Sequence, residues 1–227
     1  MTAVRSEGRA IPKWAAASVG RLSRDRPAVV TPDAVFALAG EAAAWHLGYM
    51  DRDFDGTVSV WIPTDARLPY GLRPHISAIT LGWHAGDAAR LGPTTRLLNK
   101  RRLDLTRWAA GLPAFGPEAL VAQLSARPAS FRSWADVVAH LDDLAGDVDL
   151  DRLQDLLQRQ SASAWQRAAY LLHCGHRMDE ANALLEARPK RSMPKVQFGK
   201  GAQAVWSPEF QVVDRLIAPL QSTLSKA

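Results

Sequence analysis

The spacing of apolar residues divides the chain into two parts with different periods. Two runs in the first half, VSVWI (58–62) and HISAITLGW (75–83), are rich in β-branched and aromatic residues, which is typical of strands. From residue 117 onward, apolar residues recur three and four positions apart, which is the period of an amphipathic helix. A few strands followed by a run of helices predict an α+β fold, with a small mixed β-sheet in the N-terminal half and a helix-rich C-terminal half.

The clearest helix is predicted in the segment 161–176, SASAWQRAAYLLHCGH. Ser163 is the predicted N-cap residue, and Gly175 is predicted to end the helix in the left-handed conformation. Four apolar residues then fall on one face: Trp165, Ala168, Ala169 and Leu172. We expect this face to be buried and the other helices to pack on it.

Other helices of the C-terminal half are predicted from their start signals. One begins at a capping box formed by Ser133 and Asp136, and its apolar stripe continues to Leu144. The others begin at Pro117-Glu118, at the N-cap residue Asp149, at Asp179, and at Ser207-Pro208-Glu209. The segment 189–201 between the last two is predicted to be a basic, irregular excursion, because glycine and proline interrupt it.

The N-terminal half carries weaker signals. Thr31-Pro32-Asp33 predicts a helix start, with Leu38 on the helix and a continuation or restart through residues 42–47 that Gly48 ends. Both predicted strands have apolar residues on each face, so we expect the sheet to be covered on both sides or to lie in the middle of the domain. The segment 95–108 fits a basic hairpin or a basic helix, and its periodicity does not decide between them.

Composition narrows the class of protein. An apolar fraction of 47% with 22% charged residues is typical of a folded, soluble protein, and no apolar run approaches the roughly 20 residues that span a membrane. The N-terminus lacks the apolar core of a signal peptide. Cys174 is the single cysteine, which excludes an internal disulfide and fits a reducing compartment. We therefore expect a cytoplasmic protein.

The sequence offers no recognisable catalytic site. The common motifs of nucleotide-binding proteins, zinc metalloproteases and serine hydrolases are absent. His173, Cys174 and His176 are the one metal-like cluster, and at a helix end they cannot all point the same way. Aspartates in the segment 142–155 could bind Mg²⁺, but no phosphate-binding loop accompanies them. We therefore expect no enzymatic activity, no metal and no cofactor.

Charge is distributed unevenly, although the net charge is only +5. Residues 1–26 and 90–107 are basic, and the second of these segments places Lys100, Arg101 and Arg102 near Trp108, a pattern compatible with nucleic-acid contact. Residues 136–155 are acidic instead, with seven aspartates against one arginine. A charge run is most often a solvated face, but separation of the two signs indicates a charged partner better than net charge does.

The positions of four tryptophans bear on which of them are buried. Trp45, Trp134 and Trp165 lie on apolar stripes, so we expect them in the core. Trp206, beside Lys200 and Ser207, could be a surface anchor.

Several segments, taken in order, resemble the antitoxin domain of the AbiEi family, the antitoxin half of two-gene toxin–antitoxin systems. They are ALAGEAAAWHLGY (37–49), VSVWIP (58–63), LPAFGPEALVAQL (112–124), SASAWQRAAYLL (161–172) and VWSPEFQVVDRL (205–216). Their residues are apolar and small, not catalytic, and the resemblance covers roughly residues 28 to 220. It implies a binding protein that neutralises a nucleotidyltransferase-type toxin, either in a stable complex or by antagonism without one. It also implies that Trp206 lies at a packed corner, which favours the core interpretation of this residue.

The resemblance also implies a domain organisation. AbiEi-type antitoxins usually carry an N-terminal winged helix-turn-helix, which needs about 60–70 residues. We expect residues 1–31 to be a basic segment, at most a remnant of such a module, and residues 32–227 to be the antitoxin domain, with a sheet-containing part over 32–112 and a helical part over 113–227. A DNA- or RNA-binding regulator that uses the basic segments, including Lys100, Arg101 and Arg102, is the alternative function.

The acidic segment is the predicted surface for the toxin. A nucleotidyltransferase must neutralise phosphates, so its cleft should be basic and could be covered by carboxylates. Asp136 and Asp149 are expected to cap helices. Asp142, Asp143 and Asp147 are expected to be exposed, because the stripe through Leu141 and Leu144 faces inward, and they are the candidate partner-binding residues.

Overall fold

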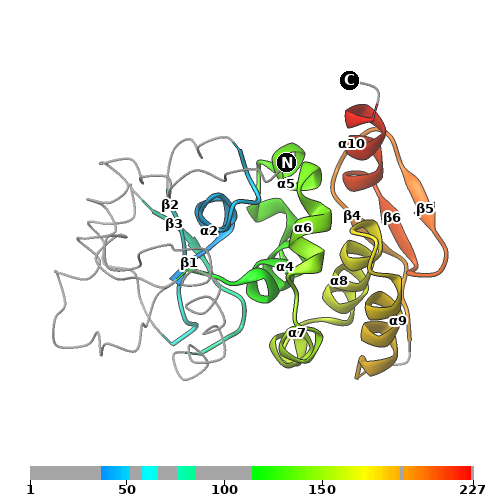
Figure 1. Cartoon of the computed structure of the whole chain (residues 1–227). Coiled ribbons are helices and arrows are strands. Elements are labelled where there is room, and N and C mark those ends of the chain that lie inside the picture. Colours follow the sequence, from blue (N-terminus) through cyan, green and yellow to red (C-terminus); the bar gives the residue numbers. More distant parts are fainter. Residues whose placement is uncertain (1–36, 52–57, 66–75, 85–113, 190–191, 226–227) are drawn as a thin grey trace, which may run out of the picture. The chain divides into compact units, whose positions relative to one another are not determined.

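A computed structural model of the chain describes residues 37–51, 58–65, 76–84, 114–189 and 192–225 (Figure 1). The chain forms two compact units. The described residues of the first unit are 37–47, 58–65, 76–84 and 114–116, and those of the second are 48–51, 117–189 and 192–225. The fold class is α+β, as predicted: a small sheet precedes a helix-dominated remainder.

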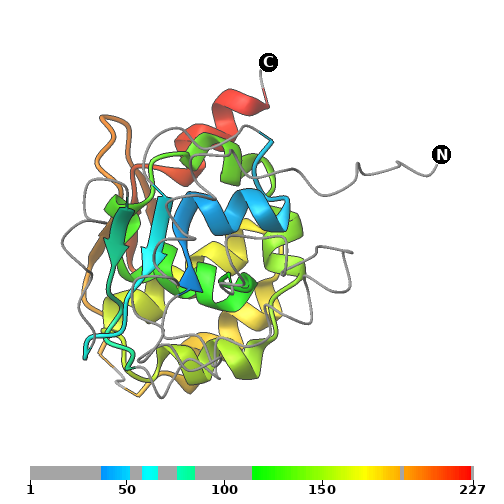
Figure 2. The same ribbon diagram turned by 90° about the vertical axis from the view of Figure 1, so that its left-hand side faces the viewer.

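The first unit is built around a three-stranded mixed sheet. Strand β2 (Val58–Trp61) lies in the middle, antiparallel to β1 (Ala37–Leu38) and parallel to β3 (Ile76–Ile79). Helix α2 (Gly40–Leu47) packs against β2, and Figure 2 shows this helix in blue beside the cyan and teal strands. The rings of Trp61, Trp83 and Phe115, each 2% exposed or less, lie 5.8–6.4 Å apart and form an aromatic core.

Two expectations for this unit need correction. Leu38 is in a strand and not in a helix, because Ala39 N donates to Ser59 O and the helix begins only at Gly40, whose φ is +53°. The sheet is covered on both sides at β2, where Ser59 to Ile62 are at most 5% exposed, but Ser77 and Ala78 of the edge strand β3 are exposed. Gly48 ends α2 with a φ of +86°, as predicted. The helix start at Thr31 and the segment 95–108 lie outside the described residues.

The second unit consists of helices and a second small sheet. Its helices are α4 (Pro117–Ala126), the 3-10 helix η5 (Pro128–Ser130), α5 (Trp134–Ala139), α6 (Leu141–Gly146), α7 (Leu150–Leu157), α8 (Ala162–Cys174), α9 (Met178–Ala187) and α10 (Ile217–Leu224). Its strands are β4 (Val196–Phe198), β5 (Val205–Ser207) and β6 (Val212–Asp214). Strand β6 is central, parallel to β4 and antiparallel to β5.

Helix α8 is the support of this unit, as its apolar stripe predicts. It packs against α4, α6 and α9 and against strands β4 and β6, and in Figure 1 the strands follow it in the order β4, β6, β5. Trp165 is 1% exposed, and its indole nitrogen donates to Leu157 O over 2.8 Å. Trp45 and Trp134 are also buried, at 5% exposure each, so the core interpretation of these three tryptophans is confirmed.

The ends of α8 differ from their predicted chemistry. Ser161, and not Ser163, is the N-cap residue, and its side chain accepts from Ala164 N. Gly175 has a φ of −93°, while His176 adopts the left-handed conformation at +59°. A Cβ atom on Gly175 would lie 2.4 Å from Ala145 Cβ. Glycine is therefore required for the close approach of α8 to α6, and not for a positive φ.

The predicted helix through residues 134–144 is two helices, α5 and α6, which meet at His140. Ser133 stands at the N-cap position of α5, but its side chain makes no capping hydrogen bond, so the capping box is wrong. Asp149 does cap α7, with its side chain accepting from Arg152 N, as predicted.

The predicted helix start at Ser207-Pro208-Glu209 is also wrong. These residues end β5 and begin the turn into β6. Pairing of the β-branched residues Val212 and Val213 with two neighbouring strands outweighs the local helix signal. The last helix begins at Ile217 instead. Its free backbone N–H groups are capped by the buried carboxylate of Asp214, which accepts from residues 216, 217 and 218.

Candidate functional site

The acidic residues singled out in the sequence lie on and beside α6. Asp142 and Asp143 occupy its first turn, where carboxylates interact favourably with the helix dipole, and Asp147 is its C-cap residue. Leu141, Leu144 and Ala145 are buried on the opposite side. The side chains of Asp142 and Asp143 are 70% and 52% exposed, so their predicted exposure is confirmed.

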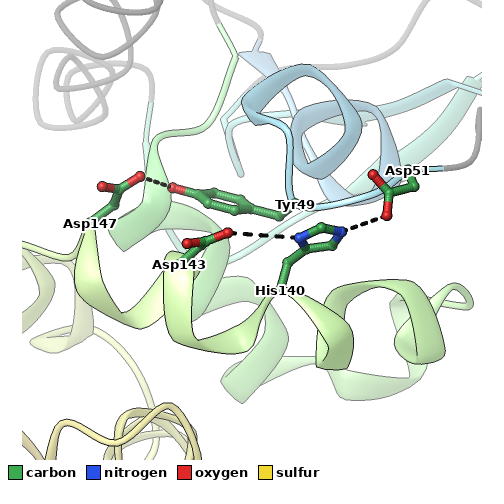
Figure 3. A network of polar contacts seen from close by, with 5 residues as sticks. All are labelled: Tyr49, Asp51, His140, Asp143 and Asp147. Atoms are coloured by element: carbon green, nitrogen blue, oxygen red, sulfur yellow. Dashed lines mark hydrogen bonds and ion pairs between the residues drawn. The ribbon is translucent and has the colours of Figure 1, made fainter. Parts of the chain in front are cut away.

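Two polar contacts fasten the segment 49–51 to α6 (Figure 3). The buried Tyr49 donates its hydroxyl to Asp147 Oδ2 over 2.8 Å. The ring of His140 lies between two carboxylates, with Nε2 2.9 Å from Asp51 Oδ2 and Nδ1 3.8 Å from Asp143 Oδ2. We call these five residues the α6 clasp. They join positions up to 98 residues apart in the sequence.

The three candidate aspartates differ in their contacts with the α6 clasp. Asp147 is half-buried and accepts from Tyr49, so the expectation of an exposed side chain is wrong for this residue. Asp143 is exposed but lies against His140. Asp142 points outward, and Nε2 of the exposed His176 lies 3.9 Å from its Oδ1. Sequence reasoning missed Tyr49, Asp51 and His140, because no local pattern signals contacts over such separations.

The metal-like cluster at the end of α8 does not converge. His173 packs its ring on Phe210 at 5.0 Å between centroids, whereas His176 is exposed. Burial raises the pKa of the Cys174 thiol to about 12, which keeps it protonated and a poor ligand at neutral pH. Within the described residues, no three histidine, cysteine, aspartate or glutamate side chains are grouped so that they could hold a metal ion.

The basic candidates fall in two places. Lys100, Arg101 and Arg102 lie outside the described residues, so their nucleic-acid contact stays a prediction. Trp206 is on the edge strand β5 and is 44% exposed, with Lys195 Nζ 4.8 Å from the centre of its ring. The core interpretation of Trp206 is therefore wrong, because an edge strand leaves its outward side chain uncovered.

Known proteins match this architecture. The family model for the AbiEi antitoxin C-terminal domain matches residues 34–174, which include the whole α6 clasp. The chain belongs to the AbiEi antitoxin family. Membership of this family suggests a role in a toxin–antitoxin system.

A solved structure is also similar to this AbiEi-family chain. It is the crystal structure of the Rv2827c protein from Mycobacterium tuberculosis, with 46% sequence identity and a TM-score of 0.82. The similarity covers 91% of the present chain and 71% of the other. A comparison with curated proteins found no match. In the part of the chain that the structure describes, no helix has the length and apolar character needed to cross a membrane.

Proposed function

We propose that the protein is a cytoplasmic antitoxin that neutralises a nucleotidyltransferase-type toxin by direct protein–protein contact and has no catalytic role of its own. The family match over residues 34–174 is the observation that carries this proposal. The toxin would be encoded beside the antitoxin gene, so an adjacent nucleotidyltransferase reading frame supports the proposal and an isolated gene weakens it.

The outward carboxylates of α6 are the proposed toxin-binding surface. Asp142 and Asp143 are exposed, and the contacts of His140 and Tyr49 brace the helix that carries them. A cleft that binds nucleotides is basic, because it must neutralise phosphates. Carboxylates opposite such a cleft speed association and fix the choice of partner more than they raise affinity.

The test compares two charge-matched double variants. Asp142→Asn with Asp143→Asn should slow association with the adjacent nucleotidyltransferase about tenfold and flatten its salt dependence, because steering depends on exposed charge. Asp151→Asn with Asp155→Asn removes two exposed carboxylates from α7 and is the control. Stopped-flow kinetics and protection of growth on co-expression are the readouts. Wild-type kinetics and protection in the α6 variant would move the interface elsewhere.

Asp147 is the third candidate partner-binding aspartate, but a substitution there changes more than the surface charge. Its replacement by asparagine weakens the Tyr49 contact as well as removing charge. The triple variant with Asp147→Asn should therefore bind like the double variant and melt at a lower temperature. Equal melting temperatures with a further loss of association would show that Asp147 itself faces the toxin.

Nucleic-acid binding through Lys100, Arg101 and Arg102 is a second proposal, which rests on the basic sequence 96–107. Such contact is set by charge, so DNA affinity should be weak and should fall steeply with salt. Tight, sequence-selective binding to the protein's own promoter at physiological salt would contradict this view and would indicate a recognition helix.

A further inference from the structure

The two edges of the β4–β6–β5 sheet differ in whether other parts of the protein bond to their backbone groups. At the β4 edge, Val196 and Phe198 bond to β6, so the Gln197 carbonyl faces outward, and it accepts from Arg167 Nε over 2.9 Å. Arg167 comes from α8 and also donates to Ser125 O of α4. A side chain of the helices therefore satisfies the outward carbonyl of the β4 edge. At the β5 edge, no further strand pairs with β5 among the described residues.

The register shows that β5 is apolar on both faces of the sheet. Trp206 lies opposite Val213, which in turn lies opposite Gln197, and this row faces away from α8. Val205 lies opposite Asp214 on the other face. Val205 and Trp206 are 46% and 44% exposed. A strand added beside β5 would therefore cover one apolar side chain on each face, as cross-strand pairs do.

The connection that leads into β5 is held in place. Arg215 donates from Nη1 to Gly201 O over 3.1 Å, and a Cβ atom on Gly201 would lie 2.3 Å from Arg215 O. Gly199 has a φ of +82°, which favours glycine. The edge is consequently presented by a fixed turn, and little ordering cost remains for a strand that pairs with it.

Charge decides which kind of strand fits. Lys195 Nζ lies over the Trp206 ring, Arg215 bonds to the connection that precedes β5, and Lys200 is exposed in that same connection. Within the described stretch 192–215, Glu209 is the one exposed carboxylate. The Asp214 carboxylate does not offset these cations for a ligand, because it is buried and accepts from Tyr170 and three backbone N–H groups. Two copies of this edge would bring like charges together, which disfavours self-pairing.

We propose that the β5 edge, centred on Val205 and Trp206, is a docking site for an extended acidic segment of a partner protein, which adds to the sheet as a fourth strand. Main-chain hydrogen bonds supply affinity in this mode, and alternate side chains supply specificity. A nucleic-acid base would instead need the open face of Trp206, and Lys195 lies over that ring at 4.8 Å. This proposal does not depend on the toxin contact proposed for α6.

The first experiment uses labelled peptides and the full chain. The probe is a fluorescein-labelled eight-residue peptide that alternates valine or threonine with aspartate or glutamate. One control replaces its acidic residues by lysine, and another N-methylates the alternate amides that would pair. In fluorescence anisotropy at low salt, the acidic peptide should bind at least about tenfold more tightly than either control. Equal binding of all three peptides would overturn the proposal.

Protein variants then locate the site. Trp206→Ala, and Lys195→Ala with Lys200→Ala, should each weaken binding of the acidic peptide about tenfold, whereas Met178→Ala should not. Met178 is a matched control, because it is 40% exposed on α9. Trp206→Phe should retain most of the binding. Amide hydrogen exchange should slow at β5 when the acidic peptide is present.

Three results would contradict strand addition. Trp206→Ala could leave peptide binding unchanged, which would place the peptide elsewhere. A labelled single-stranded oligonucleotide could bind more tightly than the acidic peptide and lose binding with Trp206→Ala, which would make the surface a nucleic-acid site. Sedimentation could show a dimer that Trp206→Ala dissociates, which would make a second copy the occupant. Asp142→Asn with Asp143→Asn should keep peptide binding intact, so failure of the toxin proposal stays separable.

Discussion

Two charged surfaces of the second unit, the acidic side of α6 and the basic β5 edge, are built in opposite ways. The acidic side of α6 is tied to a distant part of the chain: Tyr49 donates to Asp147 across 98 residues, and Asp51 contacts His140, the neighbour of Asp143, across 89 residues. The β5 edge is assembled within one stretch, because residues 195–215 supply its strands, its turn and its cations. Both surfaces rest on α8, which packs against α6 and against the sheet.

The difference shows what a run of charge in a sequence can and cannot say. Seven aspartates predict an acidic surface, but Asp147 and Asp149 also hold structure, through Tyr49 and Arg152. The outward charge on α6 is consequently smaller than the sequence suggests. At the β5 edge Lys195 and Lys200 are exposed, and the one carboxylate on strands β4, β5 and β6, that of Asp214, is buried.

The largest loss of stability should come from truncating a buried side chain of α8, on which both surfaces pack. Trp165→Ala should destabilise the protein by about 3–5 kcal/mol, as large aromatic truncations in cores do. Trp165 is 1% exposed, and its indole nitrogen donates to Leu157 O. Thermal and denaturant unfolding are the measurements. Trp165→Phe, which keeps most of the apolar volume, should cost clearly less, and an alanine variant that melts like wild type would refute the central place of α8.

The next largest loss of stability should be confined to the β5 side of the unit and leave α6 unchanged. Asp214→Asn should cost about 2–3 kcal/mol, because the buried carboxylate accepts from the backbone N–H groups of residues 216, 217 and 218 at the start of α10 and from Tyr170 Oη. Amide exchange should accelerate in α10 and β6 and stay unchanged in α6. Tyr170→Phe removes one of these contacts and should cost about 1 kcal/mol. Equal acceleration in α6 would mean that the two surfaces are not independent.

A matched pair of glycines tests the α6 side. Gly175→Ala should destabilise the protein by about 1–3 kcal/mol, because the new methyl group would lie 2.4 Å from Ala145 Cβ and 2.8 Å from Leu141 O. Gly146→Ala is the control, since no atom lies within 4 Å of its added Cβ. That control should be neutral or stabilise by up to about 1 kcal/mol. Denaturant unfolding distinguishes the two, and equal stabilities would refute the close approach of α8 to α6.

Whether a feature of the fold or of the candidate site could be predicted from the sequence depends on how far apart its interacting residues lie along the chain. Local periodicity found α4, α7, α8 and α9, and the turn glycine Gly48, because each depends on residues within one or two helical turns. It failed at residues 207–214, where strand pairing to β4 overrides a local helix start. The exposure of Asp142 and Asp143 followed from their helix face, whereas the contacts of His140 did not, since Asp51 is 89 residues away.

The smallest effect should distinguish the two aspartates at the ends of α6. Asp147→Asn should cost about 1 kcal/mol, because the acceptor of the buried Tyr49 hydroxyl loses its charge, while Asp142→Asn should change stability by less than about 0.5 kcal/mol. Tyr49→Phe in an Asp147→Ala background should add little, because alanine removes the acceptor of the Tyr49 hydroxyl, and a double-mutant cycle measures this coupling. Additive effects of Asp147→Ala and Tyr49→Phe would show that the 2.8 Å contact contributes nothing to folding. The role of Asp147 would then lie in the proposed toxin surface, together with Asp142 and Asp143.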